Sequence, residues 1–146
     1  MEKQVIQSVG FRNIQENGKV VGFQVKIRLP YYRGVFLSQI KPGNLTVDGE
    51  TFTPDQILWR VNGEDYTPQE MRADWKTHWH PMEPAVLLVK KEGGLAQGYH
   101  ELTYGFCCTH SYMPPFLEQT ADPNQPEMVF MPEMGHHLNS RRLLIV

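Results

Sequence analysis

Hydrophobic and polar residues alternate along much of the chain, and the clearest run spans residues 21–29. Valine, phenylalanine, isoleucine and leucine occupy every second position there, with glycine, glutamine, lysine and arginine between them. Successive side chains of a strand point to opposite faces, so this period of two predicts a strand with one buried face. Asn17-Gly18 just before it suits a two-residue hairpin turn, which predicts that residues 5–14 pair with residues 20–29.

Two further hairpin signals follow, Asp48-Gly49 and Asn62-Gly63. Short strands at this spacing are typical of a sandwich or barrel. We therefore predict an all-β fold, an antiparallel and jelly-roll-like β-sandwich of about eight or nine strands. Beyond the first hairpin, the predicted strands are residues 45–47, 50–53, 57–61, 64–67, 85–90, 99–108 and 143–146.

A single short helix is predicted after the third hairpin. Thr67-Pro68-Gln69-Glu70 places a capping threonine, a proline at the first helical position and a glutamate three residues after the cap. These signals predict a helix of one or two turns that ends near Ala73.

The whole chain, residues 1–146, is predicted to form one domain, in which a long Pro-rich acidic loop, residues 114–142, precedes a short closing strand. Between residues 114 and 140 there are five prolines, four acidic residues and no lysine or arginine. Loops this long are usually functional or disordered. This one also contains many large apolar side chains, so we expect it to lie against another surface.

Composition narrows the class of protein. The 14 basic and 16 acidic residues give a formal charge of −2, without the basic excess of a nucleic-acid-binding protein. The longest internal apolar run, residues 85–89, is far shorter than the about 20 residues of a membrane span. The first residues lack the apolar core of a secretory signal, and adjacent Cys107 and Cys108 could not join distant parts of the fold. We expect a cytoplasmic protein.

His78-Trp79-His80 is the first candidate for metal binding. On a strand the two histidines would share one face, about 6.6 Å apart along the chain. A cupin-like metalloenzyme using His78 and His80, with His110 from a later strand, is therefore one alternative. Pro81 and Pro84 interrupt the stretch, and this favours a hydrogen-bonded or interfacial pair instead. We predict no metal ligands and no catalytic residues on this chain, since it also lacks a nucleophile elbow and a phosphate-binding loop.

Aromatic residues in the connections indicate surface recognition. Trp75, Trp79 and Tyr112 could stack on a sugar, which makes a stand-alone carbohydrate-binding module a second alternative. The same residues could serve as anchors for a protein partner, or could cap the ends of the core.

Several short segments in combination resemble the small β subunit of bacterial C-glycoside deglycosidases. The resemblance covers roughly residues 5–117. The segments are Val47-Asp48-Gly49-Glu50-Thr51-Phe52, Ile57-Leu58-Trp59, the tryptophans at 75 and 79, Gly93-Gly94-Leu95, Gly98-Tyr99-His100-Glu101 and Ser111-Tyr112-Met113-Pro114-Pro115.

The resemblance implies that the chain is the accessory subunit of a carbon–carbon lyase. Enzymes of this family act on C-glycosides, such as those of flavonoids, that are already oxidised to a ketone at sugar C3. A base removes the acidified C2 proton, a divalent metal holds the enolate, and the aglycone leaves C1 in a β-elimination. The manganese-like metal and the base belong to a larger TIM-barrel alpha subunit, on which the β-sandwich subunit docks to form a hetero-oligomer.

We therefore assign catalysis to the partner and predict that this chain supplies an interface or pocket rim. In this prediction, His78 or His80 reaches the 3-oxo-C-glycoside substrate or forms a hydrogen bond across the interface. The predicted interface residues are Trp75, His78, Trp79, His80, Tyr112, Met113, Pro114 and Phe116.

Overall fold

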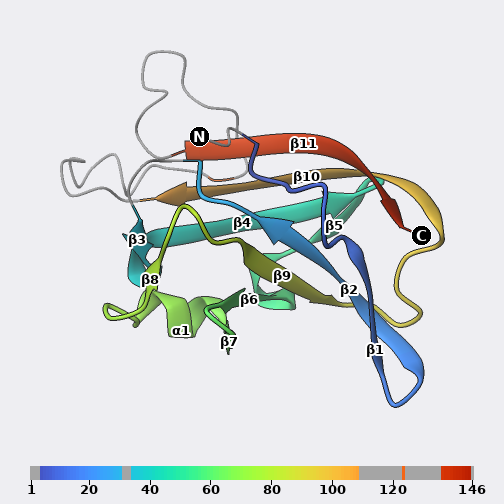
Figure 1. Ribbon diagram of the computed structural model, residues 1–146, viewed down its shortest axis with the longest axis horizontal. Coiled ribbons are helices and arrows are strands. Elements are labelled where there is room, and N and C mark those ends of the chain that lie inside the picture. Colours follow the sequence, from blue (N-terminus) through green and yellow to red (C-terminus); the bar gives the residue numbers. More distant parts are fainter. Residues whose placement is uncertain (1–3, 31–33, 109–122, 124–135, 146) are drawn as a thin grey trace.

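Two antiparallel sheets face each other in the computed structural model, which describes residues 4–30, 34–108, 123 and 136–145 (Figure 1). One sheet has the strand order β1 (Arg12–Glu16), β2 (Lys19–Ile27), β9 (Ala85–Lys90), β6 (Ile57–Val61) and β7 (Glu64–Tyr66). The other has the order β11 (His136–Ile145), β10 (Gly98–Cys108), β4 (Ile40–Val47) and β5 (Glu50–Phe52). The predicted all-β fold is confirmed.

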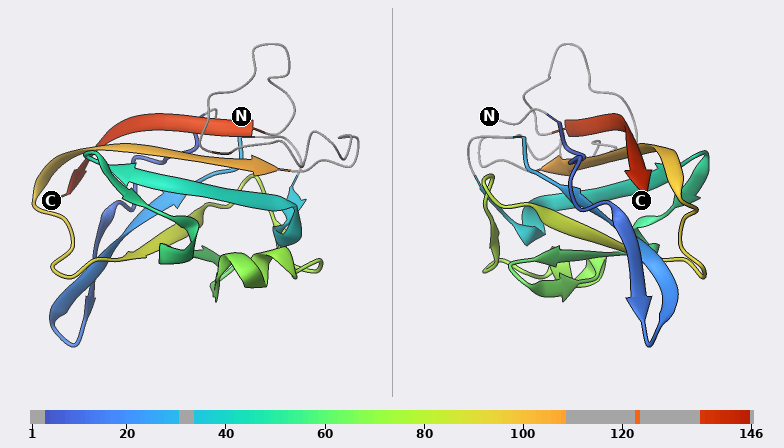
Figure 2. Two further views of the ribbon diagram at one scale, coloured as in Figure 1. Left: turned by 180° about the vertical axis from the view of Figure 1, so that it is seen from behind. Right: turned by 45° about the vertical axis from the view of Figure 1, so that its right-hand side comes forward.

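A third, small ladder closes one end of the sandwich. Strands β3 (Val35–Phe36) and β8 (His78–Trp79) pair antiparallel beside the helix α1 (Pro68–Arg72), as the view from behind also shows (Figure 2). These strands are only two residues long, too short for alternation to reveal them, and the sequence did not predict them. Two 3₁₀ turns complete the described elements, η1 (Leu37–Gln39) and η2 (Pro54–Gln56).

The three predicted hairpin turns form as expected. Asn17, Asp48 and Asn62 adopt φ values of 52°, 50° and 54°, and the glycine after each also has a positive φ. Two successive positive φ values define the turn whose twist matches that of paired strands. The predicted helix is present as α1, and the Thr67 side chain accepts a hydrogen bond from the Glu70 amide.

Both ends of the chain differ from the prediction. The first strand begins at Arg12. The segment before it forms one isolated bridge with β2, Ile6–Ile27, and the Gln24 side chain donates a hydrogen bond to the Gly10 carbonyl. The last strand begins at His136, so the predicted loop of residues 114–142 was too long and the predicted closing strand too short. The polar residues at the start of β11 do not alternate with apolar ones, so the sequence contained no strand signal there. They belong to the strand because they pair with β10.

Aromatic side chains from both sheets meet in the core. The Trp59 ring of β6 lies 5.8 Å from that of Phe106 and 6.3 Å from that of Tyr104, both on β10. Trp79 from the small ladder joins them, with its ring 5.3 Å from Trp59 and 5.6 Å from Phe106. This cluster fixes the β3–β8 ladder to the sandwich. No helix in the described ranges is long and apolar enough to cross a membrane.

Candidate functional site

The β3–β8 ladder separates buried from exposed side chains at the end of the sandwich. Val35 pairs with Trp79 and both are buried, whereas Phe36 pairs with His78 and both are exposed. His80, two residues after His78, is exposed as well. The prediction that Trp79 contacts a partner was therefore wrong, since the alternation that exposes the two histidines turns the tryptophan between them into the core.

The ring of His78 is placed by its neighbours on this small ladder. Its centroid lies 5.2 Å from that of Phe36 and 6.1 Å from that of His80, with both pairs edge to face. The ring also lies directly against Gly34, where an added Cβ would be 2.1 Å from the His78 Cε1 atom and 2.7 Å from the Trp79 carbonyl oxygen. The imidazole can therefore occupy this position only because residue 34 has no side chain.

Replacing Gly34 with alanine should disturb this end of the sandwich. The new methyl group must displace the His78 ring and β8, so we expect a loss of about 1–3 kcal/mol in unfolding free energy, measured by chemical denaturation. The double variant Gly34→Ala/His78→Ala should recover part of that loss, because only the contact with the Trp79 oxygen remains. Equal stability of Gly34→Ala and the unmodified chain would contradict the packing described here.

Trp75 stands on a short loop that its neighbour Asp74 holds rigid. The Asp74 carboxylate accepts hydrogen bonds from the Lys76 amide (2.9 Å), the Thr77 amide (2.7 Å) and the Thr77 hydroxyl (2.7 Å). The hydrogen bonds with Thr77 lower the pKa of Asp74. The backbone of the loop is also bonded to η1, with the Ser38 amide donating to the Asp74 carbonyl at 2.9 Å. Trp75 itself is 69% exposed, a large apolar side chain on a fixed backbone.

Met82 is presented by a second constrained turn. The Glu83 amide donates to the His80 carbonyl at 3.1 Å, and Pro81 restricts the turn between them. From inside the core, the Trp79 indole donates to the Glu83 carbonyl at 2.8 Å. Met82 is 73% exposed at this turn. The buried Trp79 thus helps to hold the Met82 turn in place through this hydrogen bond.

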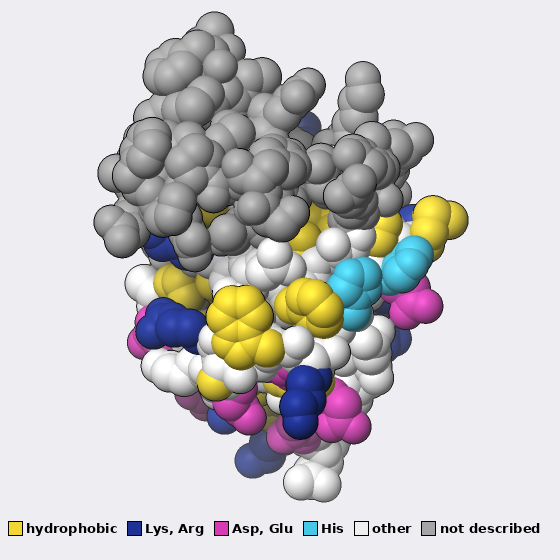
Figure 3. All heavy atoms as spheres, turned by 90° about the vertical axis from the view of Figure 1, so that its left-hand side faces the viewer, with side chains coloured by type: hydrophobic (Ala, Val, Ile, Leu, Met, Phe, Trp, Pro, Cys, Tyr) yellow, Lys and Arg dark blue, Asp and Glu magenta, His cyan; other side chains and the backbone are white. Residues whose placement is uncertain are grey.

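These groups form one surface, which we call the aromatic–histidine face. Figure 3 shows hydrophobic and histidine side chains gathered together at the β3–β8 end. Phe36 and Met82 were not predicted from the sequence; a large apolar residue between Pro81 and Pro84 was a signal for Met82. The aromatic–histidine face consists of Phe36, Trp75, His78, His80 and Met82.

Comparison with known proteins identifies the family. The family model described as "C-glycoside deglycosidase beta subunit" matches residues 1–112. A protein of Eubacterium cellulosolvens with the same description is 67% identical over 147 residues, which span 100% of both chains. The chain belongs to the C-glycoside deglycosidase beta subunit family.

More distant relatives have related descriptions. A C-glycoside deglycosidase beta subunit of Microbacterium trichothecenolyticum is 37% identical over 84 residues, 56% of this chain and 61% of that protein. A 3'-dehydrocarminate deglycosidase beta subunit of a Microbacterium species is 31% identical over 94 residues, 64% of this chain and 70% of that protein. Membership of this family makes the chain one subunit of a deglycosidase, which implies a partner subunit.

Among its described residues, this deglycosidase beta subunit brings no three His, Cys, Asp or Glu side chains together in a possible metal site. His78 and His80 share a face as predicted, but His110, the third ligand of the cupin-like alternative, lies outside the described residues. Burial and the adjacent Cys107 raise the pKa of Cys108 well above its usual value, so this thiol stays protonated and is a poor nucleophile.

The remaining predicted interface residues cannot be placed on this face. Tyr112, Met113, Pro114 and Phe116 lie outside the described residues, and their role stays a prediction. The stacking platform of a carbohydrate-binding module needed Trp79 on the surface. Because that side chain is fully buried, the three-aromatic platform does not form as predicted.

Proposed function

We propose that this chain is the non-catalytic beta subunit of a carbon–carbon lyase that cleaves 3-oxo-C-glycosides, and that it docks through the aromatic–histidine face. In this proposal the alpha subunit is a TIM barrel that provides the catalytic base and holds a manganese-like divalent metal. The C2 proton, acidified by the C3 ketone, is removed and the aglycone leaves from C1. The substrate lies at or near the interface.

The exposed, rigidly mounted apolar side chains support the docking face. Trp75 and Met82 are more exposed than most large apolar residues of a folded chain, and both stand on hydrogen-bonded turns. Tryptophan and methionine are enriched in protein interfaces. A side chain whose backbone is already ordered loses less conformational entropy on binding, so a rigid loop favours association.

The side chains in the described part of the chain support the assignment of catalysis to the alpha subunit. Proton abstraction needs a positioned base, and a metal needs three or more converging ligands. His78 and His80 supply only a pair of imidazoles, at the edge of the apolar surface. In the assembly we assign them a contact with the aglycone or a hydrogen bond across the interface, with the chemistry on the alpha subunit.

Separate purification and recombination of the two subunits tests this proposal. The isolated chain should not release aglycone from a 3-oxo-C-glycoside, even with added manganese, whereas the mixture with the alpha subunit should. Product is measured by chromatography, and complex formation by size-exclusion chromatography of the same mixtures. Turnover by the isolated chain would contradict the proposal, as would full activity of an alpha subunit that never binds this chain.

A further inference from the structure

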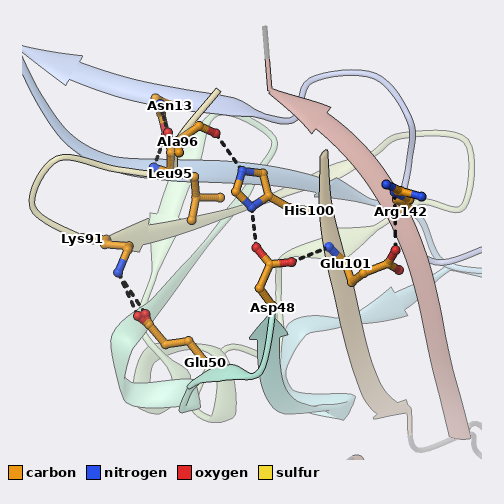
Figure 4. A network of polar contacts seen from close by, with 9 residues as sticks. All are labelled: Asn13, Asp48, Glu50, Lys91, Leu95, Ala96, His100, Glu101 and Arg142. Carbon is orange, nitrogen blue, oxygen red and sulfur yellow. Dashed lines mark hydrogen bonds and ion pairs between the residues drawn. The ribbon is translucent and has the colours of Figure 1, made fainter. Parts of the chain in front are cut away.

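His100 is a buried histidine whose two ring nitrogens both face oxygen atoms. Its Nδ1 lies 2.5 Å from the Asp48 Oδ2 atom, and its Nε2 lies 2.7 Å from the Ala96 carbonyl oxygen (Figure 4). A carbonyl oxygen and an ionised carboxylate only accept hydrogen bonds. Both nitrogens must therefore donate, and only the protonated imidazolium has two N–H groups.

The two acceptors belong to connections that meet on β10. Asp48 forms the β4–β5 turn with Gly49, and its other carboxylate oxygen accepts a hydrogen bond from the Glu101 amide at 2.8 Å. The Asp48 amide donates in return to the Glu101 carbonyl at 2.9 Å. Ala96 lies in the crossover between β9 and β10, where the chain passes from one sheet to the other. His100 thus connects the hairpin turn to the crossover.

A second pair of hydrogen bonds holds the other side of the crossover. The Asn13 side-chain amide donates to the Leu95 carbonyl, and its oxygen accepts from the Leu95 amide, both at 2.8 Å. The backbone of residues 95 and 96 is therefore fastened between Asn13 of β1 and His100 of β10, as Figure 4 shows. If the His100 hydrogen bond is lost, the two hydrogen bonds from Asn13 are the side-chain bonds that remain for these two residues in the described part of the chain.

Among the charged groups around His100, Asp48 is the one that favours its protonated form. Asp48 from the β4–β5 turn contacts it directly. Glu50 of β5 is paired with Lys91, the residue after β9, at 2.8 Å. On the neighbouring strands, Glu101 of β10 lies 3.5 Å from Arg142 of β11. The ring of Phe11 packs edge to face against the imidazole from the N-terminal segment and contributes no charge.

We propose that His100 is a protonation-dependent clamp that holds the β9–β10 crossover against the β4–β5 turn. When the imidazolium loses a proton, one ring nitrogen presents a lone pair to an oxygen atom that has lost its donor. The crossover then opens more often around residues 94–98. The contacts that form it lie within this chain, so the test needs no alpha subunit.

The direction of the pH dependence follows from the shifted pKa values. Burial lowers the pKa of His100, but the hydrogen bonds to Ala96 and Asp48 and the charge of Asp48 raise it, and the net shift is upward. A raised pKa stabilises the closed form fully below the ordinary histidine value of about 6.5. That stabilisation is lost as the pH rises through the raised pKa, so the clamp opens on the alkaline side.

Hydrogen exchange of the Leu95 and Glu101 amides across pH 5–9 tests the clamp. After correction for intrinsic exchange, their protection should fall about tenfold for each unit by which the pKa of the closed form exceeds that of the open form. The imidazole resonances of His100, followed by NMR in the same samples, should show a ring that is still doubly protonated above pH 6.5. Both readouts use the intact chain.

Three variants separate the clamp from a merely structural role. His100→Gln should give lower protection that no longer changes with pH. Asp48→Asn keeps a residue suited to the left-handed turn and an oxygen for the Glu101 amide, but it should lower the pKa of His100 and move the transition to lower pH. Glu50→Gln removes a nearby charge and its ion pair with Lys91 without touching His100, so it should keep the pH-dependent loss of protection. A neutral His100 ring at pH 6, or the same pH profile in His100→Gln, would overturn the proposal.

Discussion

Replacing Trp79 with alanine should lower the free energy of unfolding by about 3–5 kcal/mol, the usual range for a buried tryptophan or phenylalanine. The indole is fully buried and packs against Trp59 and Phe106. Its loss leaves a cavity where the small ladder meets both sheets. It also leaves the Glu83 carbonyl without the donor that holds the Met82 turn. The variant should therefore be destabilised first at the β3–β8 end.

Chemical denaturation of the two tryptophan variants side by side measures this difference. Trp75→Ala removes the same side chain from an exposed loop and should change the stability by no more than about 0.5 kcal/mol. Trp79→Phe, which keeps an aromatic ring but not the indole N–H, should fall between the two extremes. If Trp79→Ala unfolds at the same denaturant concentration as Trp75→Ala, the tryptophan at position 79 is not part of the core.

Replacing Trp75 with alanine should weaken assembly with the alpha subunit by about 2 kcal/mol, close to a 30-fold rise in Kd. This expectation follows from the proposed docking face. An exposed tryptophan on a rigid loop can insert into a partner with little loss of backbone entropy. Since the Asp74 hydrogen bonds that shape the loop involve no atom of the indole, the fold should not change.

Titration calorimetry with the purified alpha subunit measures this effect, and the chain offers a matched control. Tyr99 at the start of β10 is 63% exposed and lies at the opposite end of the sandwich from β3 and β8 (Figure 1). Tyr99→Ala should bind the alpha subunit as tightly as the unmodified chain. Equal Kd values for Trp75→Ala and the unmodified chain would exclude Trp75 from the interface, while a similar loss in both variants would point to a general effect of removing surface aromatics.

The sequence predicted those elements whose signals are local. Each hairpin turn needs two residues that tolerate a positive φ, and Asn-Gly or Asp-Gly supplies them within the turn itself. The cap of α1 is likewise decided by Thr67, Pro68 and Glu70, which are neighbours in the chain. Strand β11 was underestimated because its polar half lies at the edge of the sheet, where pairing with β10 rather than burial holds it in place.

Within the candidate site, the sequence indicated that the two histidines share a surface but not that the tryptophan between them is buried. The sequence indicated that His78 and His80 would share a face if this stretch were extended, since they are two residues apart, and both are exposed. It could not show that Trp79 fills the core at the end of the sandwich, because that depends on Trp59 and Phe106, which come from other strands. It also missed His100, whose two acceptors, Asp48 and Ala96, belong to different connections.

The sequence by itself therefore determined the fold class, the three hairpins, the short helix and the family of this protein. These features depend on periodicity and on residues close together in the chain, where geometry follows directly from residue type. Only the tertiary structure decided which aromatic residues are core and which are surface, and that His100 joins two connections. Those outcomes depend on contacts between strands far apart in sequence, and burial and hydrogen bonding exist only once these strands have come together.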